Sequence, residues 1–197
     1  KKRRVGARPV PDPNEEMLLY QTLIGARPLV EAEVPAFRER VKGYVIKAAR
    51  EAKVHTSWIN PQPEHESALL AFVDAILRPS KRNKFLTDFL RFQGKIAFYG
   101  AFNSLAQVLL KITAPGVPDV YQGTELWDLT LVDPDNRRAV DFAARRRALE
   151  EVEAAGPDPA PFLAAPEDGR IKLWLTRRAL AAVRARPEVY LKGEYLP

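Results

Sequence analysis

The sequence predicts a mainly α-helical protein, a helical assembly with one short strand. Three observations support this fold class. Apolar residues recur at helical spacing in several stretches, helix-start signals precede them, and a single segment has the glycines, prolines and apolar core of a short buried strand. Because one strand has nothing to pair with, we expect the chain to be part of a larger fold.

The first helix is predicted to begin at Asp12 and to end near Gly25. Asp12 can accept backbone N–H groups as the N-cap, Pro13 has no N–H to lose in the first turn, and Glu15 completes a capping box. We interpret the basic run at residues 1–4 as the frayed tail of an upstream helix rather than as a nucleic-acid-binding arm.

Helical spacing also predicts the later helices. Their ranges are 35–52, 63–77, 85–92 with a continuation to 112, 142–155 and 170–186. The continuation to residue 112 is apolar on more than one side, which predicts burial between layers, and Gly94 is its weak point. On these helices, Tyr20, Tyr44 and Tyr99 are expected in the core.

The strand is predicted at residues 119–121, between two Pro- and Gly-containing loops. Residues 156–169 contain four prolines and are expected to form a linker or an extended surface loop. Residues 189–191 and 194–196 are expected to begin the strands of a further domain. The predicted organisation is therefore a helical region (1–113), a strand with its loop and following helix (114–155), and a linker, helix and strand start (156–197).

Composition excludes several classes of protein. The 197 residues are 46% hydrophobic and 28% charged, as in a soluble globular protein, and no apolar run is long enough to cross a bilayer. The net charge of +6 is distributed among acidic residues, which argues against nucleic acid as a partner. There is no cysteine and there are two histidines, so we expect no metal and a cytoplasmic location.

One segment identifies a family. Residues 115–125 read Pro-Gly-Val-Pro-Asp-Val-Tyr-Gln-Gly-Thr-Glu, which resembles the eighth barrel strand of the α-amylase superfamily. The continuation through residues 126–138, including Leu-Val-Asp-Pro-Asp-Asn-Arg-Arg, is similar to maltooligosyl trehalose synthases. Residues 12–23 and 47–58 resemble the helices between barrel strands seven and eight of that family. The resemblance covers roughly residues 10–197, a late segment.

The resemblance implies a fold and a reaction. The fold would be the helical insert, eighth strand and following helices of a (β/α)8-barrel glycosidase. The complete enzyme would use two carboxyl groups to convert the reducing-end α-1,4 linkage of a maltooligosaccharide to an α,α-1,1 linkage, without a cofactor. The family's catalytic carboxylates lie on earlier strands, so no residue here is predicted to be catalytic and the isolated chain is expected to be inactive.

The resemblance also implies a substrate-binding wall, because barrel enzymes act at the carboxyl ends of their strands. The residues expected to face the sugar are Tyr121, Gln122, Glu125, Trp127, Asp133, Asp135, Asn136, Arg137 and Arg138. Carboxylates, amides and guanidinium groups bind sugar hydroxyls, and aromatic rings cover their C–H faces. A structural interpretation stays open: residues 133–136 also form a good turn, with the arginines paired to its carboxylates, and Glu125 equally suits a structural bond.

Three further expectations are open at this point. The loop containing His55 and Trp58 is interpreted as packed onto a helix by its tryptophan, in preference to a sugar-binding edge. The apolar surface around residues 112–121 is expected to permit self-association when its barrel neighbours are missing. The alternative functions are another hydrolase or transglycosidase of the superfamily, or a non-enzymatic helical binding module.

Overall fold

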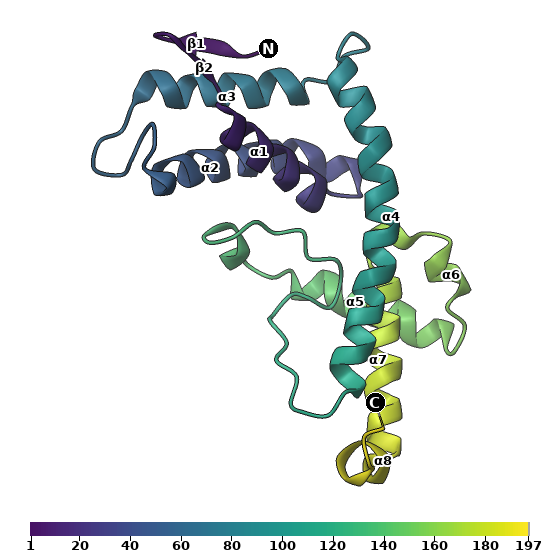
Figure 1. The fold of residues 1–197 in the computed structure, drawn as a ribbon. Helices are drawn as coiled ribbons and strands as arrows, with labels where there is room; N and C mark the ends of the chain where they lie inside the picture. Colours follow the sequence, from purple (N-terminus) through teal and green to yellow (C-terminus); the bar gives the residue numbers. More distant parts are fainter. Residues whose placement is uncertain (197) are drawn as a thin grey trace. The chain divides into compact units, whose positions relative to one another are not determined.

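The computed structural model describes residues 1–196, and the mainly α-helical class is confirmed (Figure 1). The elements are β1 (Arg3–Val5), β2 (Arg8–Val10), α1 (Pro13–Ala26), η1 (Glu31–Glu33), α2 (Val34–Ala52), α3 (Pro63–Leu77), α4 (Lys84–Thr113), η2 (Asp135–Arg137), α5 (Phe142–Ala155), α6 (Ala160–Leu163), η3 (Pro166–Asp168), α7 (Arg170–Ala185) and α8 (Pro187–Lys192). The chain forms two compact units: unit 1 contains residues 1–97 and 129–138, and unit 2 contains residues 98–128 and those from 139 onward. The predicted three-part organisation follows the resemblance and stays a prediction.

The capping box predicted at the start of α1 is confirmed. The Asp12 side chain accepts the backbone N–H of Glu15, and the Glu15 side chain accepts the backbone N–H of Asp12, each at 2.9 Å. Pro13 occupies the first turn, where the missing N–H leaves no hydrogen bond unmade. These contacts fix the point where α1 begins and hold both carboxylates in place.

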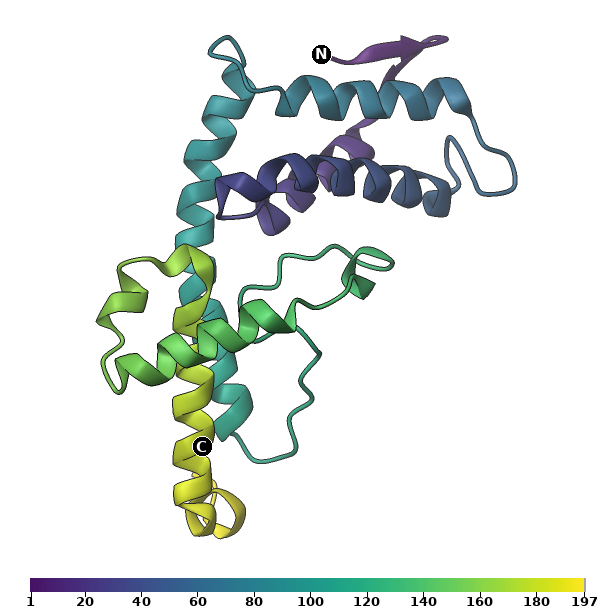
Figure 2. The same ribbon diagram turned by 180° about the vertical axis from the view of Figure 1, so that it is seen from behind.

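The prediction for the basic N-terminal run was wrong, because these residues are not part of a helix. β1 pairs with β2 in antiparallel register, with Arg3 opposite Val10 and Val5 opposite Arg8. Gly6 adopts a φ of +59° in the turn, a conformation that glycine accepts without strain. Val10 is buried, and the hairpin packs on α3 (Figures 1 and 2). Burial of Val10 and a glycine turn thus favour a hairpin here.

The core of unit 1 lies between α1, α2 and α3. Its fully buried large side chains include Leu23 of α1, Phe37 and Val41 of α2, and Leu69, Val73 and Ile76 of α3. These positions follow the helical spacing that predicted the elements. The expectation that Tyr20 and Tyr44 pack against the core is confirmed, although both rings are partly exposed.

α4 is one continuous helix that passes through Gly94. The prediction that its second half is buried between layers was wrong for the described residues. Phe98, Tyr99 and Phe102 are each more than half exposed, although their rings contact one another. The apolar residues on several sides of α4 require neighbours on several sides, and unit 2 covers only part of this helix, where Leu105 packs against its core.

The strand predicted at residues 119–121 is also not formed. This segment is irregular backbone, and among the described residues the only paired strands are β1 and β2. A strand is defined by its ladder of hydrogen bonds, and this segment has no such ladder. Val117 is almost fully exposed and Val120 is 60% exposed, whereas Ile112 is partly buried.

The core of unit 2 forms where α5, α6 and α7 meet. Its buried residues are Ala148 and Val152 of α5, Phe162 of α6, and Ile171 and Leu173 of α7. Residues 156–169 were predicted to be a linker or an extended surface loop, but they contain α6 and η3 and hold Phe162 in this core, and Gly156 accepts a hydrogen bond from the Trp174 indole at 3.1 Å. One apolar anchor among the prolines is enough to fold this segment onto the unit.

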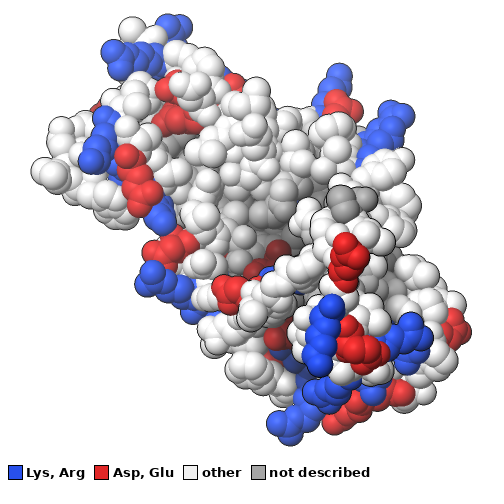
Figure 3. Space-filling model, turned by 60° about the horizontal axis from the view of Figure 1, so that its bottom comes forward, with Lys and Arg blue, Asp and Glu red and all other residues white. Residues whose placement is uncertain are grey.

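The C-terminal strand start was also predicted wrongly, because residues 187–192 form α8. Pro187 stands in the first turn of this helix, where proline is well tolerated. On the face drawn in Figure 3, Lys and Arg side chains lie among Asp and Glu side chains rather than in one continuous basic area. Of the helices within residues 1–196, none combines the length and the apolar composition needed to traverse a bilayer.

Candidate functional site

The residues predicted to face the sugar belong to two loops in different units. The first loop, residues 121–128, is part of unit 2, and the second, residues 131–138, is part of unit 1. Each loop is held by cationic side chains from helices of its own unit. None of these cations was predicted, because they stand far from the loops in the sequence.

The first loop is fastened to α5 by Arg145. The Arg145 Nε donates to Glu125 Oε2 at 2.9 Å, and its Nη2 donates to the backbone oxygen of Gly123 at 2.5 Å. Gly123 has a φ of +86°, and a Cβ there would lie 3.1 Å from the side chain of Val140. The positive φ favours glycine at 123, and a Cβ there would also push the Val140 side chain aside by a few tenths of an ångström. Glu125 has a structural partner, and its side chain keeps about a third of its surface exposed.

Trp127 packs towards the core of unit 2. Its indole N–H donates to the backbone oxygen of Pro166 at 2.6 Å, and its ring lies against the buried cluster of α5 to α7. Gly169, with a φ of +79°, passes so close that a Cβ would lie 2.7 Å from the Trp127 backbone nitrogen. At the start of the same loop, Tyr121 and Gln122 are exposed. The partly exposed Trp127 ring is thus a fixed anchor of the loop, and sugar contact by this ring stays a prediction.

Lys172 supports the same loop from α7. It is 8% exposed, and its ammonium donates to the backbone oxygen of Leu126 at 3.1 Å and lies 6.0 Å from the Trp127 ring centroid. Burial lowers the pKa of Lys172, and the carboxylates of Asp128 and Glu125 oppose that shift. A buried cation therefore stands directly behind the residues predicted to meet the substrate.

This burial gives a pH-dependent prediction. The stability of the chain relative to a Lys172→Met variant should rise between neutral pH and pH 10.5. Since the folded-state pKa lies below the ordinary 10.5, the unfolded chain binds more protons in that window, and the cost of the buried charge is relieved as pH increases. Urea denaturation of both proteins across this range measures the difference, in which the contributions of other groups cancel. Parallel pH profiles would contradict it.

The second loop is organised around Asp135. Both of its carboxylate oxygens accept from Arg40 Nε of α2, at 3.0 and 3.1 Å, and Oδ2 also accepts the backbone N–H of Leu131 at 2.6 Å. The Asp135 and Arg40 side chains are 12% and 16% exposed. Lys47 of α2 also donates to the backbone oxygen of Asp133. Asp135 is therefore a structural residue of the turn.

The remaining charged residues of this loop are more exposed. Arg137 Nε lies 2.5 Å from Asp133 Oδ1, with side chains 73% and 47% exposed. Arg138 is half exposed and pairs with Asp135 at 3.2 Å. Asn136 is exposed and takes part in an interaction within the fold. The pairing of arginines with turn carboxylates, which the structural interpretation predicted, is present, and Arg137 keeps the most surface for a ligand.

The loop after α2 is anchored by its histidine. His55 Nε2 lies 2.7 Å from Asp12 Oδ2. Trp58 is 56% exposed, with the Arg50 guanidinium carbon 4.9 Å from its ring centroid. Trp58, predicted to pack this loop onto a helix, contacts Arg50 of α2 but leaves more than half of its surface exposed, and it is His55 that joins the loop to the start of α1.

No family model matches the chain. The chain is 36% identical over 189 residues to a protein of Mycobacterium tuberculosis (strain CDC 1551 / Oshkosh) that is provisionally assigned as a maltooligosyl trehalose synthase. A crystal structure of a maltooligosyl trehalose synthase is 38% identical, with a TM-score of 0.78 over 92% of this chain. The structure of maltooligosyltrehalose synthase from Arthrobacter ramosus is 40% identical, with a TM-score of 0.72 over 88% of this chain.

These comparisons place the chain in a class of synthases, and it corresponds to one segment of these much longer proteins. It spans 22% of the Mycobacterium tuberculosis protein and 24% and 21% of the two solved chains. The synthases that it matches are the maltooligosyl trehalose synthases. The resemblance stated from the residues around 115–138 is therefore confirmed in sequence and in fold.

Proposed function

We propose that the chain is the part of a maltooligosyl trehalose synthase that supports one wall of the sugar site. The complete enzyme would isomerise the reducing-end α-1,4 linkage of a maltooligosaccharide to an α,α-1,1 linkage by intramolecular transglucosylation. The observation that carries this proposal is the similarity to maltooligosyl trehalose synthases along nearly the whole chain, at 36–40% identity.

The proposed chemistry divides between the chain and the rest of the enzyme. In a retaining mechanism one carboxylate attacks the anomeric carbon, while a second carboxyl protonates the leaving oxygen and later activates the incoming hydroxyl. Both groups would come from outside this chain. The chain would supply exposed groups such as Arg137, whose guanidinium can hold the released glucose while it turns to present its anomeric hydroxyl.

The exposed apolar surface supports the same proposal. Phe98, Tyr99 and Phe102 of α4, together with Val117 and Val120, lie on unit 2 and are each more than half exposed. Isolated exposed side chains are ordinary, but a run of aromatic rings on one helix marks a surface made for contact. We propose that the remainder of the enzyme covers this surface, and that copies of the isolated chain would associate through it.

A chimeric enzyme tests the proposal. In this chimeric enzyme, the chain replaces the matching segment of the Arthrobacter ramosus maltooligosyltrehalose synthase. Incubated with maltopentaose, it should form a non-reducing isomer at a rate within about tenfold of the parent, because the supplied segment would rebuild the same wall, whereas the isolated chain should form none. The product is measured by loss of reducing ends and by chromatography.

The alternatives predict different products. A folded chimeric enzyme that releases only glucose and shorter oligosaccharides would favour a hydrolase segment over the proposed isomerase segment. A folded chimeric enzyme with no action on maltopentaose, beside an active parent, would overturn the proposal and favour a helical binding module. A cooperative thermal transition matching that of the parent establishes that the chimeric enzyme is folded.

A further inference from the structure

Unit 1 contains a second group of chemically able side chains, at the start of α1. Asp12 and Glu15 belong to the capping box, His55 comes from the loop after α2, and His65 comes from α3. Asp12, His55 and His65 border a cavity of about 960 Å³. None of the four residues belongs to the loops predicted to meet the sugar.

The capping box occupies only one oxygen of each carboxylate. Asp12 Oδ1 accepts the N–H of Glu15, and Glu15 Oε2 accepts the N–H of Asp12. Asp12 Oδ2 and Glu15 Oε1 therefore remain for other partners. Because the box is fixed by two backbone bonds, both remaining oxygens are held in position before any ligand arrives.

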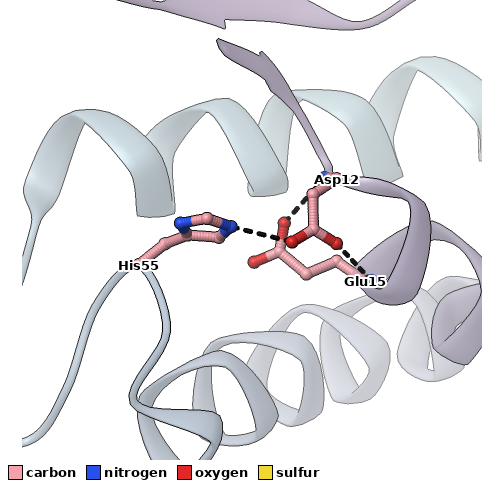
Figure 4. A group of neighbouring side chains, drawn as sticks. All are labelled: Asp12, Glu15 and His55. Carbon is pink, nitrogen blue, oxygen red and sulfur yellow. Dashed lines mark hydrogen bonds and ion pairs between the residues drawn. The ribbon is translucent and has the colours of Figure 1, made fainter.

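A histidine meets each remaining oxygen. His55 Nε2 lies 2.7 Å from Asp12 Oδ2, and His65 Nε2 lies 2.7 Å from Glu15 Oε1. The two imidazole rings are neighbours, with centroids 4.8 Å apart. Figure 4 shows the His55 ring pointing at the Asp12 carboxylate, with the Glu15 carboxylate beside it. Two imidazole nitrogens and two carboxylate oxygens thus come together from three segments.

We propose that Asp12, Glu15 and His55 form a zinc-binding site, with His65 as the partner that orients Glu15. Each of the three residues offers a ligand atom, and these atoms lie within 4.8 Å of one another. One imidazole with two carboxylates is a ligand set that suits Zn²⁺, and three protein ligands leave a fourth position for water. A ligating carboxylate that also accepts a hydrogen bond is the usual outer arrangement of such sites.

The local charge permits a cation at this helix start. The N-terminus of a helix carries about half a positive charge, and two carboxylates exceed it. Burial raises the pKa of Asp12, but hydrogen bonds from the Glu15 backbone and from His55 outweigh burial and lower it overall, so Asp12 is ionised at neutral pH. Arg8 and Lys53 border the same cavity and oppose a cation, but both are exposed to solvent, which screens them.

The two histidines were set aside in the sequence because they do not make a His-rich centre. The fold brings one of them to two carboxylates that are 40 or more positions away, which no sequence spacing indicates. A bound ion would join the start of α1 to the loop after α2, and so stabilise unit 1 at a place where three segments meet. It would take the place of the hydrogen bond between His55 and Asp12.

Titration of the 197-residue chain with zinc chloride tests the site. Calorimetry should show one ion per chain at neutral pH, with a raised thermal midpoint, and Co²⁺ in its place should give the visible absorption of a four-coordinate centre. Magnesium at the same concentration should have no effect, because it prefers an all-oxygen octahedral site. A folded chain that takes up no zinc at neutral pH would overturn the proposal.

Three variants separate this site from adventitious binding. Asp12→Asn keeps an N-cap acceptor but removes a charged ligand, and His55→Gln removes the nitrogen ligand; each should weaken zinc binding at least tenfold. Glu64→Gln, an exposed carboxylate on the same cavity, is the matched control and should bind as the unchanged chain does. Equal zinc affinity in all three variants would assign the ion to the surface and overturn the site. Circular dichroism establishes that each variant is folded.

Discussion

Replacing Asp135 by alanine should lower the free energy of unfolding of unit 1 by about 2–4 kcal/mol. The carboxylate accepts two contacts from Arg40 and one backbone N–H from Leu131, and both charged side chains are largely buried. Its loss would leave the guanidinium with the Leu129 backbone oxygen, at 2.7 Å, and the face of the Phe37 ring, and would leave a backbone donor unpaired. An unpaired buried charge and donor have costs of this size. Urea denaturation followed by circular dichroism measures the change.

Asp133→Ala is the matched control for this prediction. It removes a carboxylate from the same turn, but one whose ion pair with Arg137 joins two exposed side chains, so the expected change is below about 1 kcal/mol. Equal losses in the two variants would mean that Asp135 is not the anchor of the loop. A loss of stability in the Asp135 variant alone would establish that this residue supports the loop, whether or not the loop binds a sugar.

Replacing Arg137 by alanine in the chimeric enzyme should raise the ratio of free glucose to isomerised product about tenfold. This prediction depends on the proposed function. An arginine bond to a sugar hydroxyl contributes about 1.5–3 kcal/mol, and about 1.4 kcal/mol corresponds to a factor of ten. A weaker hold on the released glucose lets water compete for the intermediate. Product analysis after incubation with maltopentaose gives the ratio.

Because Arg137 is exposed, its replacement should change product formation without changing the stability of the fold. Its side chain is 73% exposed, so its removal should change the free energy of unfolding by less than about 0.5 kcal/mol. Arg146→Ala, an exposed arginine on α5, should leave the ratio unchanged. If Arg137→Ala leaves the ratio unchanged while lowering the thermal midpoint, the loop is a scaffold and holds no glucose.

The sequence predicted best what depends on neighbouring residues. The start of α1 follows from Asp12, Pro13 and Glu15, which interact within one turn, and the bounds of α3 and α5 match the predicted 63–77 and 142–155. These signals are local, since capping and helical spacing involve residues within a few positions of one another. Such elements can be predicted without knowing what packs on them.

Two of the failures share one physical cause, which is dependence on a distant partner. The strand predicted at 119–121 needs a ladder, and the burial predicted for Tyr99 needs a neighbour, but the residues themselves specify neither. The supports of the candidate site are of the same kind. Arg40 stands 95 positions from Asp135, and Lys172 stands 46 positions from Leu126. A sequence spacing gives no information on such pairs.

The sharing of α4 between the two units restricts how this part of the protein can vary in length. Residues 84–97 of the helix belong to unit 1 and residues 98–113 to unit 2, with no loop at the boundary. One residue added to a helix turns everything beyond it by about 100° and shifts it by about 1.5 Å. Phe85 and Phe89 both pack into the core of unit 1, and an insertion or deletion between them would turn one of the two rings out of that core, so related genes should preserve the length of this part of the helix even where its amino acids differ.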